Sequence, residues 1–405
     1  MDSWRDVSIW KSLALNDAET GSLLASIDAE RTASPALIAR LRRQHAAPTV
    51  SAAIELMHAR RKAIGKLDFA PQCYADLEGV EMASSSRGAL WKAERFAAAS
   101  LRELPLLDLC TGVGADLHAI VERCGAARVL GVELDPLRAW MAATNARCRV
   151  READVASHEV QAMISGALLH CDPPRRDASG RVWKRGSQTT NEFDLGSLLA
   201  WMRAARGGAL KLGPGVAREL VCAPDTECEF IEVDTTMEQC VVWTGALAPQ
   251  PNSTRATRLG ATTHTRVGVP RAVPQAEAIG PYLYEPCAAI ERAGLLSDLA
   301  VEIDASEIAR GLGLLTGARE HASPWAECFE IAGEISRSPT EAISRRCTVG
   351  GPEQFRSVRV RGKALDEFGG ADRVTKALGC QSNGSLVLHA WRDGAKCACV
   401  VTRVV

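Results

Sequence analysis

The sequence predicts an α/β fold in which a mostly parallel sheet is covered by helices and flanked by two further domains. Three observations support this. The first ninety residues place apolar side chains three and four apart, as helices do. From Leu104 to about residue 215, short apolar runs alternate with helical segments. A proline-dotted connector, VGVPRAVPQAEAIGP, then precedes the last unit. We therefore expect a helical domain at 1–90, the sheet domain at 91–270 and a small α+β domain at 281–405.

Composition excludes several classes of protein. The 405 residues are 46% apolar and 24% charged, which is typical of a globular chain, and the net charge of −1 excludes a uniformly basic surface. The fourteen cysteines form no C-x-x-C pair, so we expect free thiols and no metal site. Acidic residues interrupt every apolar run near the start. We expect no signal peptide, no membrane span and a cytoplasmic location.

The helical first domain is locally basic. Residues 38–66 carry seven basic side chains against Glu55 alone, and these are Arg40, Arg42, Arg43, Arg60, Arg61, Lys62 and Lys66. A solvated helix face is the simpler interpretation of this run. Contact with a polyanion is the alternative.

The strongest motif is DLCTGVGAD, residues 108–116, which follows an apolar strand and precedes a helix. Gly112 and Gly114 permit a tight strand-to-helix turn, and the helix start offers unpaired N–H groups to a ligand. A dinucleotide site favours a small residue at position 117, where this chain has Leu117. The motif therefore disfavours a nicotinamide cofactor.

Acidic residues follow the next strands. Glu133 ends RVLGVE, at the position from which an acid binds both ribose hydroxyls of a nucleotide. Asp154 follows the third strand and Asp172 follows the fourth, where a Pro-Pro turn comes next. Two such acids and this turn are foreign to a dehydrogenase. Asp135, before Pro136, is expected to cap the following helix.

These motifs resemble those of class I S-adenosylmethionine-dependent methyltransferases, whose sheet is Rossmann-like and ends in an antiparallel edge. More narrowly, DLCTGVGAD, GVELDP, HCDPPRRD and YLYEPCAAIERAG resemble bacterial methyltransferases with a C-terminal THUMP-like domain. The resemblance implies S-adenosyl-L-methionine as cofactor and roles for ten residues. The cofactor-binding residues are Asp108, Gly112, Gly114, Asp116, Glu133, Asp154 and Val155, and the catalytic residues are Asp172, Pro173 and Pro174.

The chain departs from amino-methylating nucleic-acid enzymes after the two prolines. Those enzymes commonly have an aromatic residue there, and this chain has Arg175. A guanidinium also stacks on bases and binds phosphates. The polar segment beyond Pro174 is therefore expected to bind substrate through Arg175, Arg176, Trp183, Lys184 and Arg185. D-P-P-R also occurs in uracil C5-methylating enzymes, but the cysteine that they need has no evident equivalent around GALKLGPGV.

The expected substrate is RNA, either tRNA or rRNA, because THUMP domains accompany RNA-modifying enzymes. Residues 281–330 hold three basic and nine acidic side chains, whereas residues 337–405 hold twelve basic and six acidic ones. This polarity suggests a surface for an anion. Two alternatives stay open: a methyltransferase acting on a small molecule or a protein, and a cofactor-binding factor that associates with RNA without catalysis.

Overall fold

The structure is a computed structural model that describes residues 3–15, 17–30, 32–99, 101, 103–174, 194–345 and 354–405. The chain divides into two compact units. Unit 1 comprises residues 1–253 and 259–261, and unit 2 comprises residues 254–258 and 262–405. Residues 1–90 lie in unit 1 together with the sheet domain. The division into three domains stays a prediction.

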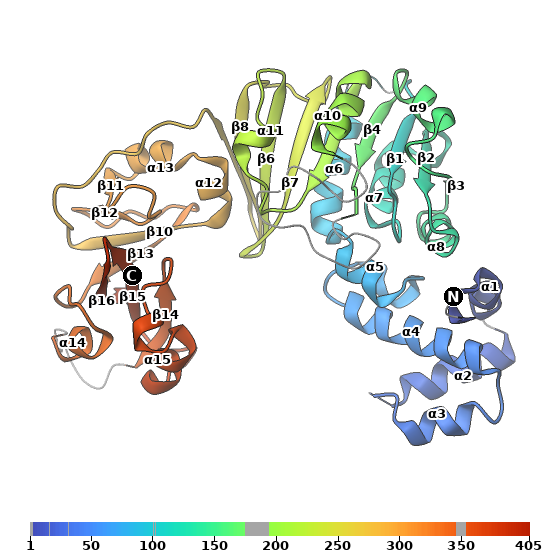
Figure 1. The fold of residues 1–405 in the computed structure, drawn as a ribbon, viewed down its shortest axis with the longest axis horizontal. Helices are drawn as coiled ribbons and strands as arrows, with labels where there is room; N and C mark the ends of the chain where they lie inside the picture. Colours follow the sequence, from blue (N-terminus) through green and yellow to red (C-terminus); the bar gives the residue numbers. More distant parts are fainter. Residues whose placement is uncertain are drawn as a thin grey trace. The chain divides into compact units, whose positions relative to one another are not determined.

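Helices open unit 1 and are drawn in blue in Figure 1, where most of them gather at one end of the strands and the last one runs alongside the sheet. They are η1 (Ser3–Arg5), α1 (Val7–Leu15), α2 (Ala18–Asp28), α3 (Pro35–Leu41), α4 (Ala47–Ala63), η2 (Ala70–Gln72), α5 (Leu77–Met82) and α6 (Ser86–Ala98). Side chains of Asp17, Ser34, Asp76 and Ser85 cap α2, α3, α5 and α6 by accepting from backbone N–H groups. The apolar core of α1 to α5 also includes Val113, Leu137 and Met141, so these helices pack on the segments that connect the first strands of unit 1.

The large sheet carries seven of its strands in unit 1, in the order β3-β2-β1-β4-β5-β7-β6. The first five are parallel: β1 (Leu106–Leu109), β2 (Val129–Glu133), β3 (Arg149–Glu152), β4 (Leu168–Cys171) and β5 (Gly207–Leu212). The hairpin β6 (Thr226–Val233) and β7 (Thr236–Gly245) adds antiparallel strands. The predicted Rossmann-like fold with an antiparallel edge is confirmed.

Helices connect the parallel strands as a Rossmann-like fold requires. They are α7 (Ala115–Cys124), η3 (Ala126–Arg128), α8 (Pro136–Ala146), α9 (His158–Ile164), α10 (Leu195–Ala204) and α11 (Arg218–Val221). The strand order reverses direction between β1 and β4, and ligands bind such sheets beyond the carboxyl ends of the strands at this switch point. The predicted cap is present, because Asp135 accepts from the N–H groups of Leu137 and Arg138.

Unit 2 is an α+β unit built on a second sheet of order β11-β12-β10-β13-β16-β15-β14. Its elements are β8 (Ser253–Leu259), β9 (Thr263–Gly268), β10 (Tyr282–Pro286), α12 (Ala288–Ala293), α13 (Leu296–Glu302), β11 (Ala305–Glu307), β12 (Leu315–Gly317), β13 (Ala326–Ile331), α14 (Pro339–Ser344), β14 (Phe355–Val360), η4 (Asp366–Phe368), α15 (Ala371–Leu378), β15 (Leu386–Asp393) and β16 (Lys396–Val404). The THUMP-like assignment of this region stays a prediction.

Two further findings concern the described part of the chain. None of its helices combines the length and the apolar character needed to cross a bilayer. Its thirteen cysteines are free thiols.

Candidate active site

A cavity of about 400 Å³ lies at the carboxyl ends of β1 to β4 in unit 1. Most of the residues with predicted roles line it: Asp108, Gly112, Asp116, Glu133, Asp154, Val155, Asp172 and Pro174. Gly114 and Pro173 are not among the lining residues. Side chains that follow different strands thus meet in one place, as parallel strands allow.

The two glycines of the turn serve different purposes. Gly112 has φ of +59°, and a Cβ added there would meet nothing within 4 Å, so its backbone is open to a ligand. Gly114 has φ of +84°, and its added Cβ would lie 2.9 Å from Cα of Ala142 in α8. The missing side chain at Gly114 therefore allows close packing of the turn on α8 and does not open the cavity, in contrast to our expectation that both glycines lie under a ligand.

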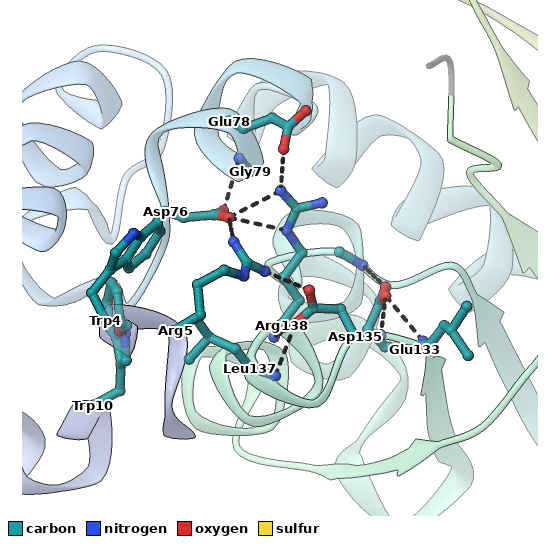
Figure 2. A network of polar contacts seen from close by, with 12 residues as sticks. Trp4, Arg5, Trp10, Asp76, Glu78, Gly79, Glu133, Asp135, Leu137 and Arg138 are labelled. Atoms are coloured by element: carbon teal, nitrogen blue, oxygen red, sulfur yellow. Dashed lines mark hydrogen bonds and ion pairs between the residues drawn. The ribbon is translucent and has the colours of Figure 1, made fainter. Parts of the chain in front are cut away.

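Glu133 is held rigidly by backbone donors. Its Oε2 accepts from the N–H of Gly112 at 2.7 Å, and its Oε1 accepts from the N–H groups of Leu134 and Asp135 at 3.0 Å each (Figure 2). Burial raises the pKa of Glu133, and these N–H donors oppose that rise. The carboxylate is fixed beside the turn with lone pairs left for hydroxyl donors.

Asp154 and Val155 form the wall beyond β3. The Asp154 Oδ1 accepts from the N–H of Ala156 at 2.8 Å, an Asx turn that fixes the side chain locally. Val155 is buried, and Asp154 is exposed. The pair presents one carboxylate and one apolar surface to the cavity.

A cluster of buried charges lies beneath the cavity. His170 in β4 contacts Asp108 through Nδ1 at 2.6 Å, and the Lys92 Nζ lies 2.6 Å from Asp116. The Lys211 Nζ lies 2.5 Å from the Asp172 Oδ2 and 3.7 Å from the Asp116 Oδ2. Both lysine side chains are 1% exposed. Buried charges are costly unless paired, so this arrangement has to be kept together.

The pKa values of Asp116 and Asp108 are shifted in opposite directions. Burial alone would raise the pKa of Asp116, but Lys92, Lys211 and His170 hold it below the ordinary range. Burial raises the pKa of Asp108 in spite of its contact with His170. The Asp108 Oδ2 is buried and accepts no hydrogen bond from any residue that the structure describes. Asp108 is also one of the residues that line the cavity.

Sequence reasoning missed Lys92, Lys211 and His170. A signal was present, since His170 is the one polar residue in LLHC and Lys211 the one charged residue in GGALKL, both strands buried throughout. A charge inside such a strand needs a partner. Arg175, Arg176, Trp183, Lys184 and Arg185 lie outside the described residues. Over the described ranges, no group of acids, histidines and cysteines is arranged to hold a metal ion.

The N-terminal basic run is largely engaged inside unit 1. Five of its seven cations contact oxygens of neighbouring segments: Arg40 with Glu30, Arg60 with Cys73, Arg61 with Ile27, Lys62 with Glu81, and Lys66 with Val80. These contacts join helices and loops. The run is therefore weak support for a polyanion.

Part of the charge polarity of unit 2 is paired within the unit, since three of the twelve basic residues of 337–405 contact acids of 281–330. Arg359 contacts Glu285 and Glu327, Arg361 contacts Glu285 and Glu291, and Arg403 contacts Glu330. Basic residues of 337–405 thus neutralise acids of 281–330 within one unit. The expectation that this polarity marks a surface for an anion is not supported by this arrangement.

Comparison with known proteins agrees with the geometry. No protein-family model matches the chain. The chain is 26% identical over 365 residues to an uncharacterized S-adenosylmethionine-dependent methyltransferase of Mycobacterium tuberculosis, found in strains CDC 1551 / Oshkosh and ATCC 25618 / H37Rv. That match covers 87% of this chain and 95% of the relative.

A solved structure shares the fold. A candidate methyltransferase from Porphyromonas gingivalis W83 superposes with a TM-score of 0.72 at 17% identity, over 95% of this chain and 98% of that one. The predicted fold, the predicted class of enzyme, an S-adenosylmethionine-dependent methyltransferase, and the predicted cofactor are confirmed.

Proposed function

We propose that this S-adenosylmethionine-dependent methyltransferase transfers a methyl group to a base nitrogen of RNA, either tRNA or rRNA. One observation carries the proposal: Asp172, directly after β4, lines the same cavity as Gly112, Glu133 and Asp154. An acceptor held at Asp172 would then lie beside a nucleoside held by the first three strands.

The lining residues fit the cofactor. Glu133 would accept from both ribose hydroxyls, and Asp154 with the Val155 backbone would bind the adenine edge. The open backbone of Gly112 would pass under the methionine part. The unpartnered Asp108 Oδ2 would accept from the ammonium group. Asp116 contacts Lys92 and accepts from Ser84 at 2.8 Å, so its part would be to hold these residues or to bind the ammonium through water.

The residues at Asp172 would orient the acceptor. The cofactor supplies a methyl group activated by a sulfonium, so catalysis depends mainly on alignment and on exclusion of water. The Asp172 carboxyl group, which contacts Lys211 through Oδ2, would accept from an N–H of the acceptor amine and aim the lone pair of the amine. As the N–C bond formed, the bond between the methyl carbon and the sulfonium sulfur would break and leave S-adenosylhomocysteine, and the methylated nitrogen would release a proton that Asp172 is placed to receive. Pro173 and Pro174 would keep this turn rigid.

RNA is favoured by the sequence that follows the site. Pro174 lines the cavity, and residues 175–185 supply five cations and an indole: Arg175, Arg176, Arg181, Lys184, Arg185 and Trp183. Guanidinium and indole groups bind phosphates and stack on bases. This segment supports the proposal more than the paired basic residues described above.

Methylation of RNA from a strain that lacks the enzyme tests the proposal. With a labelled methyl donor, we expect the wild type to produce one methylated nucleoside, identified by mass spectrometry. Asp172→Ala should slow label transfer about 100-fold or more, with unchanged affinity for S-adenosylhomocysteine. Asp225→Ala, which removes an exposed partner of Arg203, is the matched control.

The other outcomes separate the alternatives. Label in protein or in small molecules, with none in RNA, would replace the RNA proposal by the first alternative. Cofactor binding with no transfer to any fraction would identify a non-catalytic factor. Equal transfer by Asp172→Ala and the wild type would contradict the role of Asp172.

The contribution of the arginines is tested by binding. Arg175→Ala combined with Arg176→Ala should weaken the binding of total tRNA and reduce its salt dependence, because each phosphate contact releases counterions. Affinity for S-adenosylhomocysteine should stay as in the wild type. Unchanged tRNA binding at low salt would remove the support that this segment gives to RNA.

A further inference from the structure

Part of the cavity wall comes from outside the sheet. Gly79, Met82, Ala83 and Ser84, in α5 and the turn after it, line the cavity opposite the strand ends. A Cβ added to Gly79 would lie 2.3 Å from a methyl carbon of Val113 in the glycine turn, so α5 packs on that turn without space between them. The N-terminal helices therefore complete the cavity.

Asp76 is the polar centre that holds this wall. It is 2% exposed, and its Oδ1 caps α5 by accepting from the N–H of Gly79 at 2.9 Å. Its Oδ2 accepts from Arg5 at 3.1 Å and from two nitrogens of Arg138 in α8 at 3.0 and 3.3 Å. Figure 2 shows both guanidinium groups converging on this carboxylate. One buried acid thus joins η1, α5 and α8.

The same contacts reach the residues that face the cavity. Arg5 also donates to Asp135, the cap of α8, and the backbone N–H of Asp135 donates to Glu133. Arg138 lines the cavity and has Glu78 as a further partner at 2.8 Å. Displacement of η1 would therefore disturb both the α5 wall and the loop that orients Glu133.

We propose that Arg5, Asp76 and Arg138, the Asp76 cluster, are positioning residues that couple the N-terminal segment to cofactor binding. The cluster holds α5 against the glycine turn and keeps Glu133 in place. By linkage, a ligand in the cavity stabilises the cluster, and the cluster strengthens ligand binding to the same extent. The inference rests on the proposed cofactor residues and is independent of the RNA substrate.

Calorimetry with S-adenosylhomocysteine on the full chain tests the coupling. Arg5→Met should weaken binding about five- to tenfold, although Arg5 itself does not line the cavity. Arg5→Lys, which keeps the charge, should recover part of the loss. Arg61→Met is the matched control, because Arg61 also ties N-terminal segments together, through the carbonyls of Ile27 and Glu30. It should leave the affinity unchanged.

Hydrogen exchange tests the coupling first in the wild type and then in Arg5→Met. In the wild type, S-adenosylhomocysteine should slow the exchange of amides in 3–10 and 77–84, and Arg5→Met should reduce this protection. Two results would overturn the coupling alone. One is that Arg5→Met and the wild type have equal affinity and equal protection. The other is that the ligand leaves the exchange of amides in 3–10 of the wild type unchanged. If the wild type does not bind the ligand, both the assignment of the cofactor-binding residues and the coupling are contradicted. If it binds the ligand but does not methylate RNA, only the proposed RNA substrate is contradicted.

Discussion

The two units treat buried ionisable groups in opposite ways. In unit 1, Lys92, Lys211 and His170 hold the pKa of the buried Asp116 below its ordinary range beneath a cavity, and the Asp108 Oδ2 is left without a donor among the described residues. In unit 2, His389 is 1% exposed in the sheet core, and burial together with Arg359 and Arg361 lowers its pKa to about 3. Unit 2 therefore disfavours the charge of its buried histidine, whereas unit 1 favours the charge of Asp116.

This difference indicates where to look for chemistry. The arginine–glutamate pairs of unit 2 are partly exposed and neutralise part of the charge polarity of its sequence. Such pairs contribute little each, and they point to no ligand. A charged group kept in a dry site with an unsatisfied atom facing a cavity is a better marker of function.

The largest expected effect is on the stability of unit 1. Lys92→Met removes a buried ammonium that contacts Asp116 and donates to Ser84 and Gln239 at 3.0 Å each. Because the buried Asp116 carboxylate loses its nearest cation, we expect a loss of about 3–5 kcal/mol in the free energy of unfolding. Denaturant unfolding measures it. A loss below about 1 kcal/mol would mean that the cluster is no more costly to break than a surface pair.

The next effect is acid destabilisation of unit 2. His389 is neutral in the fold and protonated in the unfolded chain, so its stabilising contribution is present above pH 6.5 and is lost as the pH falls toward 3. At about pH 4 the loss should reach about 3 kcal/mol, measured by hydrogen exchange in β15 and β16. His389→Phe should flatten this dependence.

His321→Gln is the matched control for that measurement, because His321 is exposed in the same unit. An identical pH dependence in His389→Phe and the wild type would contradict the assignment to His389.

A smaller effect concerns ligand binding in unit 1. Glu133→Ala removes the hydrogen bonds expected to the ribose, worth about 1.5–3 kcal/mol together, and should weaken cofactor binding ten- to a hundredfold. Calorimetry measures it. Glu152→Ala is the control, since Glu152 pairs in register with Glu133 on β3 but is exposed and lies away from the cavity lining. Similar losses in both variants would argue against the ribose role.

The smallest effect should come from a surface pair of unit 2. Arg345, whose side chain is 49% exposed, contacts Glu334 and Glu341. Arg345→Ala should change the free energy of unfolding by less than about 1 kcal/mol, and less still at high salt. A change as large as that of Lys92→Met would remove the contrast between the units.

Features set by residues that are adjacent in the sequence could be predicted from the sequence alone. The glycine turn, the Asp135 cap and the acids after β2, β3 and β4 follow from strand-to-helix punctuation. The contact of Asp76 with Arg138 joins residues 62 positions apart, and no periodicity signals such a pair. The pairing of Arg359, Arg361 and Arg403 with acids of 281–330 could not be predicted for the same reason, since composition gives only a count of charges.

The hairpin of β6 and β7 has a consequence for synthesis on the ribosome. Lys92 in α6 donates to Gln239 in β7, 147 residues later, and Ser85 donates to Glu238 nearby at 2.6 Å. At roughly 5–20 residues per second, β7 is synthesised about 7–30 s after α6. During that interval the nascent chain holds a lysine whose final environment has not been made, so α6 completes its native contacts only after β7 has been synthesised.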